Sequence, residues 1–132
     1  QLSPSGKYLA WIEFDANLLH SKLVVGNSNA DSAKALTDGI YYVLNPNWHP
    51  SENFILFSSN LASYDNFELY VYDLKLKCIK RLSYLSSKEL DPTFSPDGVS
   101  VYFSSNLSGD FQIYQMPFLP PETCSLSAAA VM

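Results

Sequence analysis

The side chains that could carry acid–base, nucleophilic or metal chemistry are few and do not form a recognisable motif. His20 and His49 are the only histidines, and Cys78 and Cys124 are the only cysteines. No second histidine or cysteine stands at zinc-ligand spacing, and no Asp-x-Asp-x-Asp run provides a calcium loop. No Gly-x-Ser-x-Gly elbow marks a nucleophilic serine, and the five glycines never cluster into a phosphate-binding loop. We therefore expect no catalytic residue, no metal site and no cofactor.

Three side chains stand out as candidates for binding a partner. His49 lies in a Trp-His-Pro turn, where comparable segments of the chain carry serine. Asp91 precedes a proline at a predicted strand, where its carboxylate would lie near the inner edge of the fold or cap the backbone. Tyr64 lies in a polar loop, and a loop aromatic can anchor a partner. For His49 and Asp91, a purely structural role is the favoured interpretation.

A disulfide between Cys78 and Cys124 is the less favoured of two alternatives. Two cysteines are too few for a disulfide framework, and Cys124 lies in a segment of irregular composition. We therefore expect both thiols to be free.

Composition indicates one folded domain rich in strands. The chain has 132 residues, of which 47% are hydrophobic and 14% aromatic, and aromatic residues favour strands. Its net charge is −5 with only eight Lys and Arg in total, so no basic patch for nucleic acid is expected. No run of about 18 apolar residues exists, so insertion into a membrane is not expected.

An internal repeat of 46 residues organises the chain. Pro4, Pro50 and Pro96 are evenly spaced, and each is followed by a short run of aromatic and aliphatic residues. The motif Ser-Ser-Asn-Leu at 58–61 returns at 104–107. Repeats of this length are typical of blades or solenoid units.

Each repeat unit has the pattern of short strands joined by tight turns. Pro-Ser-Gly at 4–6 and Pro-Asp-Gly at 96–98 are turn sequences, because proline presets φ and glycine supplies a positive φ. The second unit has Ser-Glu-Asn at 51–53 instead, so its turn is expected to differ in type. Four short strands in 40–50 residues match a propeller blade. In the second unit the strands are expected at about 43–48, 53–59, 67–73 and 77–83.

The repeat resembles that of TolB-like β-propellers. The resemblance rests on Phe94-Ser-Pro-Asp-Gly98, the strand that follows it, and Gly109-Asp-Phe-Gln-Ile-Tyr114, with a similar second copy. It covers about residues 1–118. Segments of the first unit also look similar to blades in the propellers of prolyl-oligopeptidase-type serine peptidases.

The resemblance implies an all-β, incomplete propeller segment of about three four-stranded blades. Such propellers usually have six or more blades, so we favour a fragment of a longer chain over two copies that close together. Open blade edges, with aromatics such as Trp11 and Phe103 on the end faces, predict self-association. The expected units are about 1–42, 43–89 and 90–118, followed by an irregular tail at 119–132.

As a function, the resemblance implies a non-catalytic scaffold that binds a protein or peptide. An exported, periplasmic location is favoured by the resemblance, and a cytoplasmic one stays open. The alternative is the substrate-gating propeller of a prolyl-oligopeptidase-type peptidase whose catalytic domain is absent from this chain. In either case the chain itself is expected to be inert as an enzyme.

Overall fold

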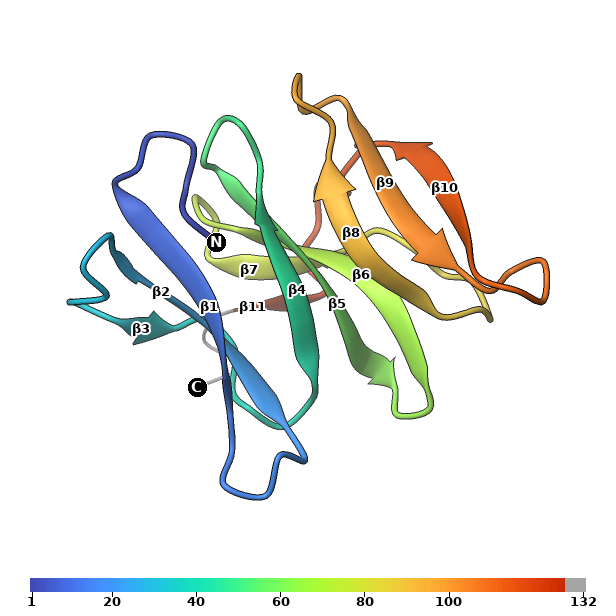
Figure 1. Cartoon of the computed structure of the whole chain (residues 1–132), viewed down its shortest axis with the longest axis horizontal. Coiled ribbons are helices and arrows are strands. Elements are labelled where there is room, and N and C mark those ends of the chain that lie inside the picture. The colour runs from blue at the N-terminus through green and yellow to red at the C-terminus, as the bar shows by residue number, and fades with distance from the viewer. Residues whose placement is uncertain (128–132) are drawn as a thin grey trace.

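The computed structural model describes residues 1–127, and all regular secondary structure in this range is β (Figure 1). This confirms the all-β class that the repeat and its resemblance imply. The strands are β1 (Tyr8–Phe14), β2 (Ser21–Asn27), β3 (Lys34–Ala35), β4 (Val43–Trp48), β5 (Phe54–Ser63), β6 (Asn66–Asp73), β7 (Cys78–Arg81), β8 (Glu89–Phe94), β9 (Ser100–Ser105), β10 (Gln112–Pro117) and β11 (Leu126–Ser127).

The strands form three antiparallel sheets that follow one another along the chain. The first has the order β1-β2-β3, the second β4-β5-β6-β7-β11, and the third β8-β9-β10. Figure 1 shows β4 between β1 and β8, so the sheets meet along one edge in an open arc. Leu2 makes a single bridge to Leu9 at the place where the other sheets have β4 and β8. The first sheet therefore keeps only a remnant of an inner strand.

The same turn precedes the second strand of every unit, although the second unit lacks the glycine. Gly6 and Gly98 both have φ of 77°, and Glu52 at the equivalent position has φ of 64°. In each turn the amide of this residue donates to the carbonyl three residues earlier at 2.9 Å. The expectation of a different turn type is therefore wrong. Glu52 adopts a backbone that favours glycine, and its carboxylate accepts a hydrogen bond from the Ser5 amide at 2.8 Å.

Two apolar clusters hold the sheets together, one on each face of the second sheet. Neighbouring residues of a strand point to opposite faces. Ile55 and Phe57 therefore enter the cluster against the first sheet, while Leu56 enters the cluster against the third. All three side chains are fully buried. Burial on both faces explains why β5 and β6 are apolar without a clean alternation.

The segment after β10 returns to the second sheet, which corrects two expectations. Cys124 forms a disulfide with Cys78 of β7, with a Cα–Cα distance of 5.8 Å. The Ser125 amide donates to the Ile79 carbonyl at 2.7 Å, and β11 pairs with β7. The expectation of free thiols is wrong, and the tail is not irregular throughout. The physical reason is that β7 would otherwise present an unpaired row of amides and carbonyls.

Candidate functional site

The three candidate residues lie in three separate places. Tyr64 lies in the β5–β6 hairpin, His49 precedes the other end of β5, and Asp91 lies within β8. Since β5 spans ten residues, Tyr64 and His49 are separated by roughly 30 Å at about 3.3 Å per residue. A single small ligand therefore cannot contact both Tyr64 and His49.

His49 is engaged by protein groups through both ring nitrogens. Its Nδ1 lies 2.8 Å from Ser51 Oγ, and its Nε2 lies 3.0 Å from the Gly98 carbonyl oxygen. The ring centroid is 4.8 Å from that of Phe94, which it meets edge-on, and 5.2 Å from that of Phe118. These contacts join the turns of the second and third units, which supports the structural interpretation of this residue.

Tyr64 is 70% exposed at the tip of its hairpin. Its carbonyl accepts a hydrogen bond from Asn60 Nδ2 at 3.2 Å, which fixes the backbone of the hairpin and leaves the ring facing solvent. The exposure fits a loop anchor, and its role in binding stays a prediction.

Asp91 has an unusual backbone that is repeated one unit earlier in the chain. Its φ is 52°, and Asn45, 46 residues before it, has φ of 57°. Each residue precedes a proline and lies where the pairing register shifts between the first two strands of its sheet. Among residues with a Cβ, Asn and Asp tolerate this left-handed conformation best. Backbone strain of this kind gathers at binding sites, so the pair marks a candidate surface.

Asn45 and Asp91 share a hollow of about 460 Å³ at the edge where the three sheets meet. The Asn47 side chain accepts a hydrogen bond from the Phe94 amide at 2.9 Å, which ties β4 to β8 beside it. The first sheet contributes Ala10, Trp11 and Ile12 to the opposite wall, whereas the Trp11 indole itself packs over Gly26 of β2. The hollow thus combines a carboxylate with amides and apolar side chains. This inner hollow is lined by Gln1, Ala10, Trp11, Ile12, Asn45, Pro46, Asn47, Asp91 and Pro92.

A buried pair of carboxylates between the second and third sheets was not anticipated from the sequence. Glu68 and Glu89 are 1% and 0% exposed. The Ser83 hydroxyl donates to Glu68 at 3.0 Å and lies 3.4 Å from Glu89. The hydroxyls of Ser87 and Ser105 donate to Glu89 at 2.6 and 3.0 Å. A glutamate alternating with apolar residues in a strand has the pattern of a solvent-facing position, so no sequence signal distinguished this pair.

Burial raises the pKa of the Glu68 carboxyl above its ordinary value. The Ser83 hydroxyl lowers this pKa, whereas the neighbouring Glu89 raises it. Since hydroxyl groups satisfy both carboxylates inside the protein, the arrangement fits a structural polar network between two sheets.

No three His, Cys, Asp or Glu side chains within residues 1–127 gather closely enough to hold a metal ion. In the same range, no helix is long and apolar enough to cross a lipid bilayer.

Three consecutive antiparallel sheets that share a 46-residue repeat and meet along one edge define a segment of a β-propeller. Residues 1–128 match the TolB beta propeller domain family. The chain therefore belongs to this family, which confirms the resemblance carried by the Ser-Pro-Asp-Gly repeat.

Solved structures of the same fold include both TolB proteins and a peptidase. The putative TolB from Agrobacterium tumefaciens is 22% identical with a TM-score of 0.76, over 88% of this chain and 40% of that protein. TolB from Acinetobacter baumannii is 21% identical with a TM-score of 0.71, over 95% of this chain and 30% of that protein. A puromycin-hydrolyzing peptidase from Mycobacterium tuberculosis is 16% identical with a TM-score of 0.70, over 87% of this chain and 19% of that protein.

At these identities the likeness establishes the fold. The chain spans 40% of the Agrobacterium protein and a smaller share of the other two.

Proposed function

We propose that this chain is a non-catalytic part of a propeller that binds a protein or peptide segment at the inner hollow. The observation that carries the proposal is the matched pair of left-handed residues, Asn45 and Asp91, in the wall of the inner hollow. Rigid strands hold this pair, and rigid strands are suited to presenting a binding surface.

The chemistry of the inner hollow favours an extended segment with a basic side chain next to an apolar one. The Asp91 carboxylate accepts hydrogen bonds and attracts a cation. Ile12, Pro46 and Pro92 supply apolar surface beside it. The net charge of −5 adds a general attraction for basic segments.

A displayed library of random twelve-residue peptides tests the proposal. Peptides selected on the wild-type chain are then measured against Asp91→Lys and against Asp110→Lys, which makes the same change of charge in an exposed loop. We expect Asp91→Lys to weaken binding about tenfold or more, by replacing an attraction with a repulsion, while Asp110→Lys matches the wild type. If the selected peptides bind Asp91→Lys as tightly as the wild type, the inner hollow is excluded as their binding site. Hydrolysis of peptide esters by the purified chain would contradict the non-catalytic part.

A second candidate function is the substrate-gating propeller of a prolyl-oligopeptidase-type serine peptidase. It is favoured by the likeness to the puromycin-hydrolyzing peptidase. Sequencing the source gene beyond both ends of the chain separates the two. A downstream Gly-x-Ser-x-Gly followed by Asp and His would support the peptidase, and further Ser-Pro-Asp-Gly repeats without a hydrolase domain would support the scaffold.

A further inference from the structure

A second opening lies against the second sheet, beside the connection from β3 to β4 and away from the inner hollow. Its volume is about 380 Å³, which falls within the range of small-molecule sites. It shares no lining residue with the inner hollow. We call it the tyrosine cleft, and the lining residues that matter here are Tyr41, Ala62, Tyr70, Arg81, Tyr84 and Ser125.

Arg81 supplies a cation to the tyrosine cleft. Its guanidinium carbon lies 4.1 Å from the ring centroid of Tyr84, a side chain that is 70% exposed. Its Nε donates to the Ser83 carbonyl at 2.8 Å, and one terminal nitrogen lies 3.6 Å from the Glu68 carboxylate. A guanidinium has five N–H donors, so these contacts leave donors for a ligand. Burial raises the pKa of Glu68, and the charge of Arg81 opposes that rise.

Tyr70 supplies a buried hydroxyl without an acceptor among residues 1–127. The side chain is 1% exposed, and its ring centroid lies 5.8 Å from that of Phe57, on which it stacks. No group within the described range accepts a hydrogen bond from the hydroxyl. Burial raises the pKa of this hydroxyl, whereas Arg81 and the Ala62 amide oppose the rise. A buried hydroxyl that lacks an acceptor is costly and calls for an explanation.

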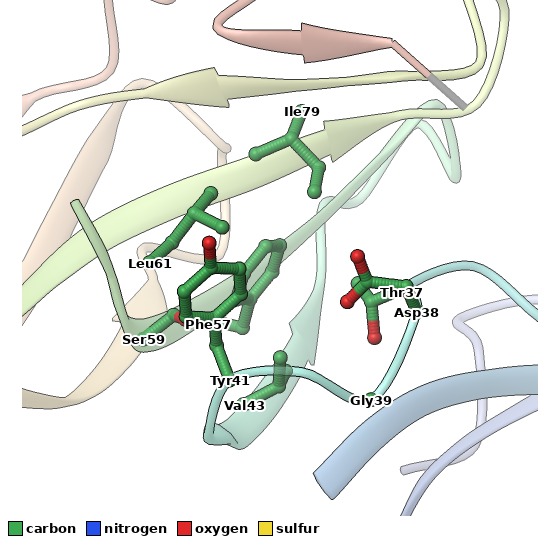
Figure 2. A pocket seen from close by; sticks show the side chains of 9 residues that line it. All are labelled: Thr37, Asp38, Gly39, Tyr41, Val43, Phe57, Ser59, Leu61 and Ile79. Atoms are coloured by element: carbon green, nitrogen blue, oxygen red, sulfur yellow. The ribbon is translucent and has the colours of Figure 1, made fainter. Parts of the chain in front are cut away.

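The wall of the cleft is aromatic and closed on its inner side. Figure 2 shows a small cavity with Tyr41, Phe57 and Leu61 on one side and Thr37 and Asp38 on the other. This cavity has a volume of only about 10 Å³, too small for a ligand. Tyr41 and Leu61 line both spaces, so they form the wall between the cavity and the cleft.

We propose that the tyrosine cleft binds an aromatic carboxylate. The carboxylate accepts the hydrogen bond that Tyr70 cannot make within the protein and pairs with Arg81, while the aromatic group packs against Tyr41 and Tyr84. A neutral ligand would bind the guanidinium more weakly than a carboxylate does, and an aliphatic ligand would gain less from the tyrosine rings. The same chemistry is carried by a free aryl acetate and by a peptide that ends in an aromatic residue.

Calorimetric titration of the full chain compares two matched pairs of probes. Indole-3-acetate is compared with indole-3-acetamide, and acetyl-Ala-Ala-Trp with its C-terminal amide. We expect each carboxylate that binds to lose about tenfold or more in affinity when it is replaced by the amide. Tighter binding of indole-3-acetate assigns the cleft to a free small molecule, and tighter binding of the peptide assigns it to a chain terminus. No binding of either carboxylate at about 1 mM would overturn the proposal.

Tyr70→Phe and Tyr72→Phe provide a matched pair of variants. Both residues lie on β6, both are buried, and only Tyr70 lines the cleft. Tyr70→Phe should weaken binding of the carboxylate about tenfold or more without lowering the melting temperature, because it removes a hydroxyl that donates to no acceptor among residues 1–127. Tyr72→Phe should leave affinity unchanged. Equal affinity of Tyr70→Phe and wild type, or equal binding of acid and amide, would contradict the proposal. Asp91→Lys should have no effect, so this inference and the proposed function can fail separately.

Discussion

Asp73 fixes the end of the β6–β7 hairpin through both carboxylate oxygens. Oδ2 lies 3.1 Å from Lys80 Nζ, and both side chains are 7% exposed. Oδ1 accepts hydrogen bonds from the amides of Lys75 and Leu76 at 2.9 Å each. Burial acts to raise the pKa of Asp73, but the two amides and Lys80 together hold it below its ordinary value.

Asp73→Asn should lower the free energy of unfolding at pH 7 by about 3 kcal/mol, since it leaves the Lys80 ammonium buried without a counter-charge. A carboxyl whose pKa is depressed on folding contributes stability above its unfolded pKa, near 3.8. That contribution is lost as the pH falls through the folded pKa. The difference between wild type and variant, measured by urea unfolding, should therefore shrink from pH 7 toward pH 3.

Asp110→Asn, an exposed site, is the matched control for the loss of one carboxylate. A difference between wild type and Asp73→Asn that stays constant over this pH range would show that the ion pair contributes no pH-dependent stability.

At the scale of elements, the disulfide and β11 attach the end of the described chain to the second sheet. Cys78 is buried, and the bond joins residues 46 positions apart. The amide of Arg81 also donates to Ser125 Oγ at 3.1 Å, so three kinds of contact hold the segment. Loss of the disulfide removes the covalent contact and leaves the strand pairing and the Ser125 hydrogen bond in place.

Reduction of the disulfide should lower the free energy of unfolding by about 3–4 kcal/mol, because the reduced unfolded chain gains the entropy of an open loop. Chemical denaturation with and without dithiothreitol measures the change. The double variant Cys78→Ser, Cys124→Ser should be indifferent to dithiothreitol. Two reactive thiols per chain in the unreduced, denatured protein would contradict the bond.

The β5–β6 hairpin is an element in which a side chain can be changed without loss of the fold. Tyr64→Ala should change the free energy of unfolding by no more than about 0.5 kcal/mol, because the ring is 70% exposed. Tyr70→Ala in the same sheet, which removes a buried ring, is the contrasting variant and should cost about 3 kcal/mol or more. A large loss for Tyr64→Ala in thermal unfolding would make it a core residue.

For the molecule as a whole, the two outer sheets each leave one face that no other sheet within residues 1–127 covers. Phe103, expected on such a face, is instead 6% exposed and packs against the second sheet. The third sheet exposes Tyr102 and Ile113, which are 38% and 74% exposed. Trp11 remains partly exposed on the first sheet. The aromatic and aliphatic surface expected at the open ends is therefore present, with different residues on the third sheet.

This surface predicts self-association of the purified chain. Light scattering coupled to gel filtration should give a molar mass that rises above 14.8 kDa as concentration increases. Ile113→Lys should reduce the effect, and Tyr64→Lys at the hairpin tip should not. A constant monomer mass over the whole concentration range would contradict the prediction.

The repeat predicted much of this architecture because its information is local. The strand expected at 43–48 matches β4, and the one expected at 67–73 matches β6 apart from its first residue. The carboxylate pair of Glu68 and Glu89 and the return of the tail to β7 could not be predicted in the same way. Both depend on contacts between segments that only the packed sheets bring together. The type of the second turn was also mispredicted. Glu52 adopts the positive φ that favours glycine, because the hydrogen bonds of its amide and carboxylate outweigh the backbone preference of a glutamate.

The disulfide carries a consequence for how the last segment of the chain is assigned to a sheet. Cys124 follows Cys78 by one repeat length, so 124–127 is the stretch that the repeat would place as the outer strand of the third sheet. It pairs with β7 instead, which leaves β10 as an edge strand. The free edges of β7 and β10 can thus both pair with the segment 124–127. Oxidation commits the segment to the second sheet, and a reducing compartment would free it to exchange toward β10, giving four strands to each of the two sheets.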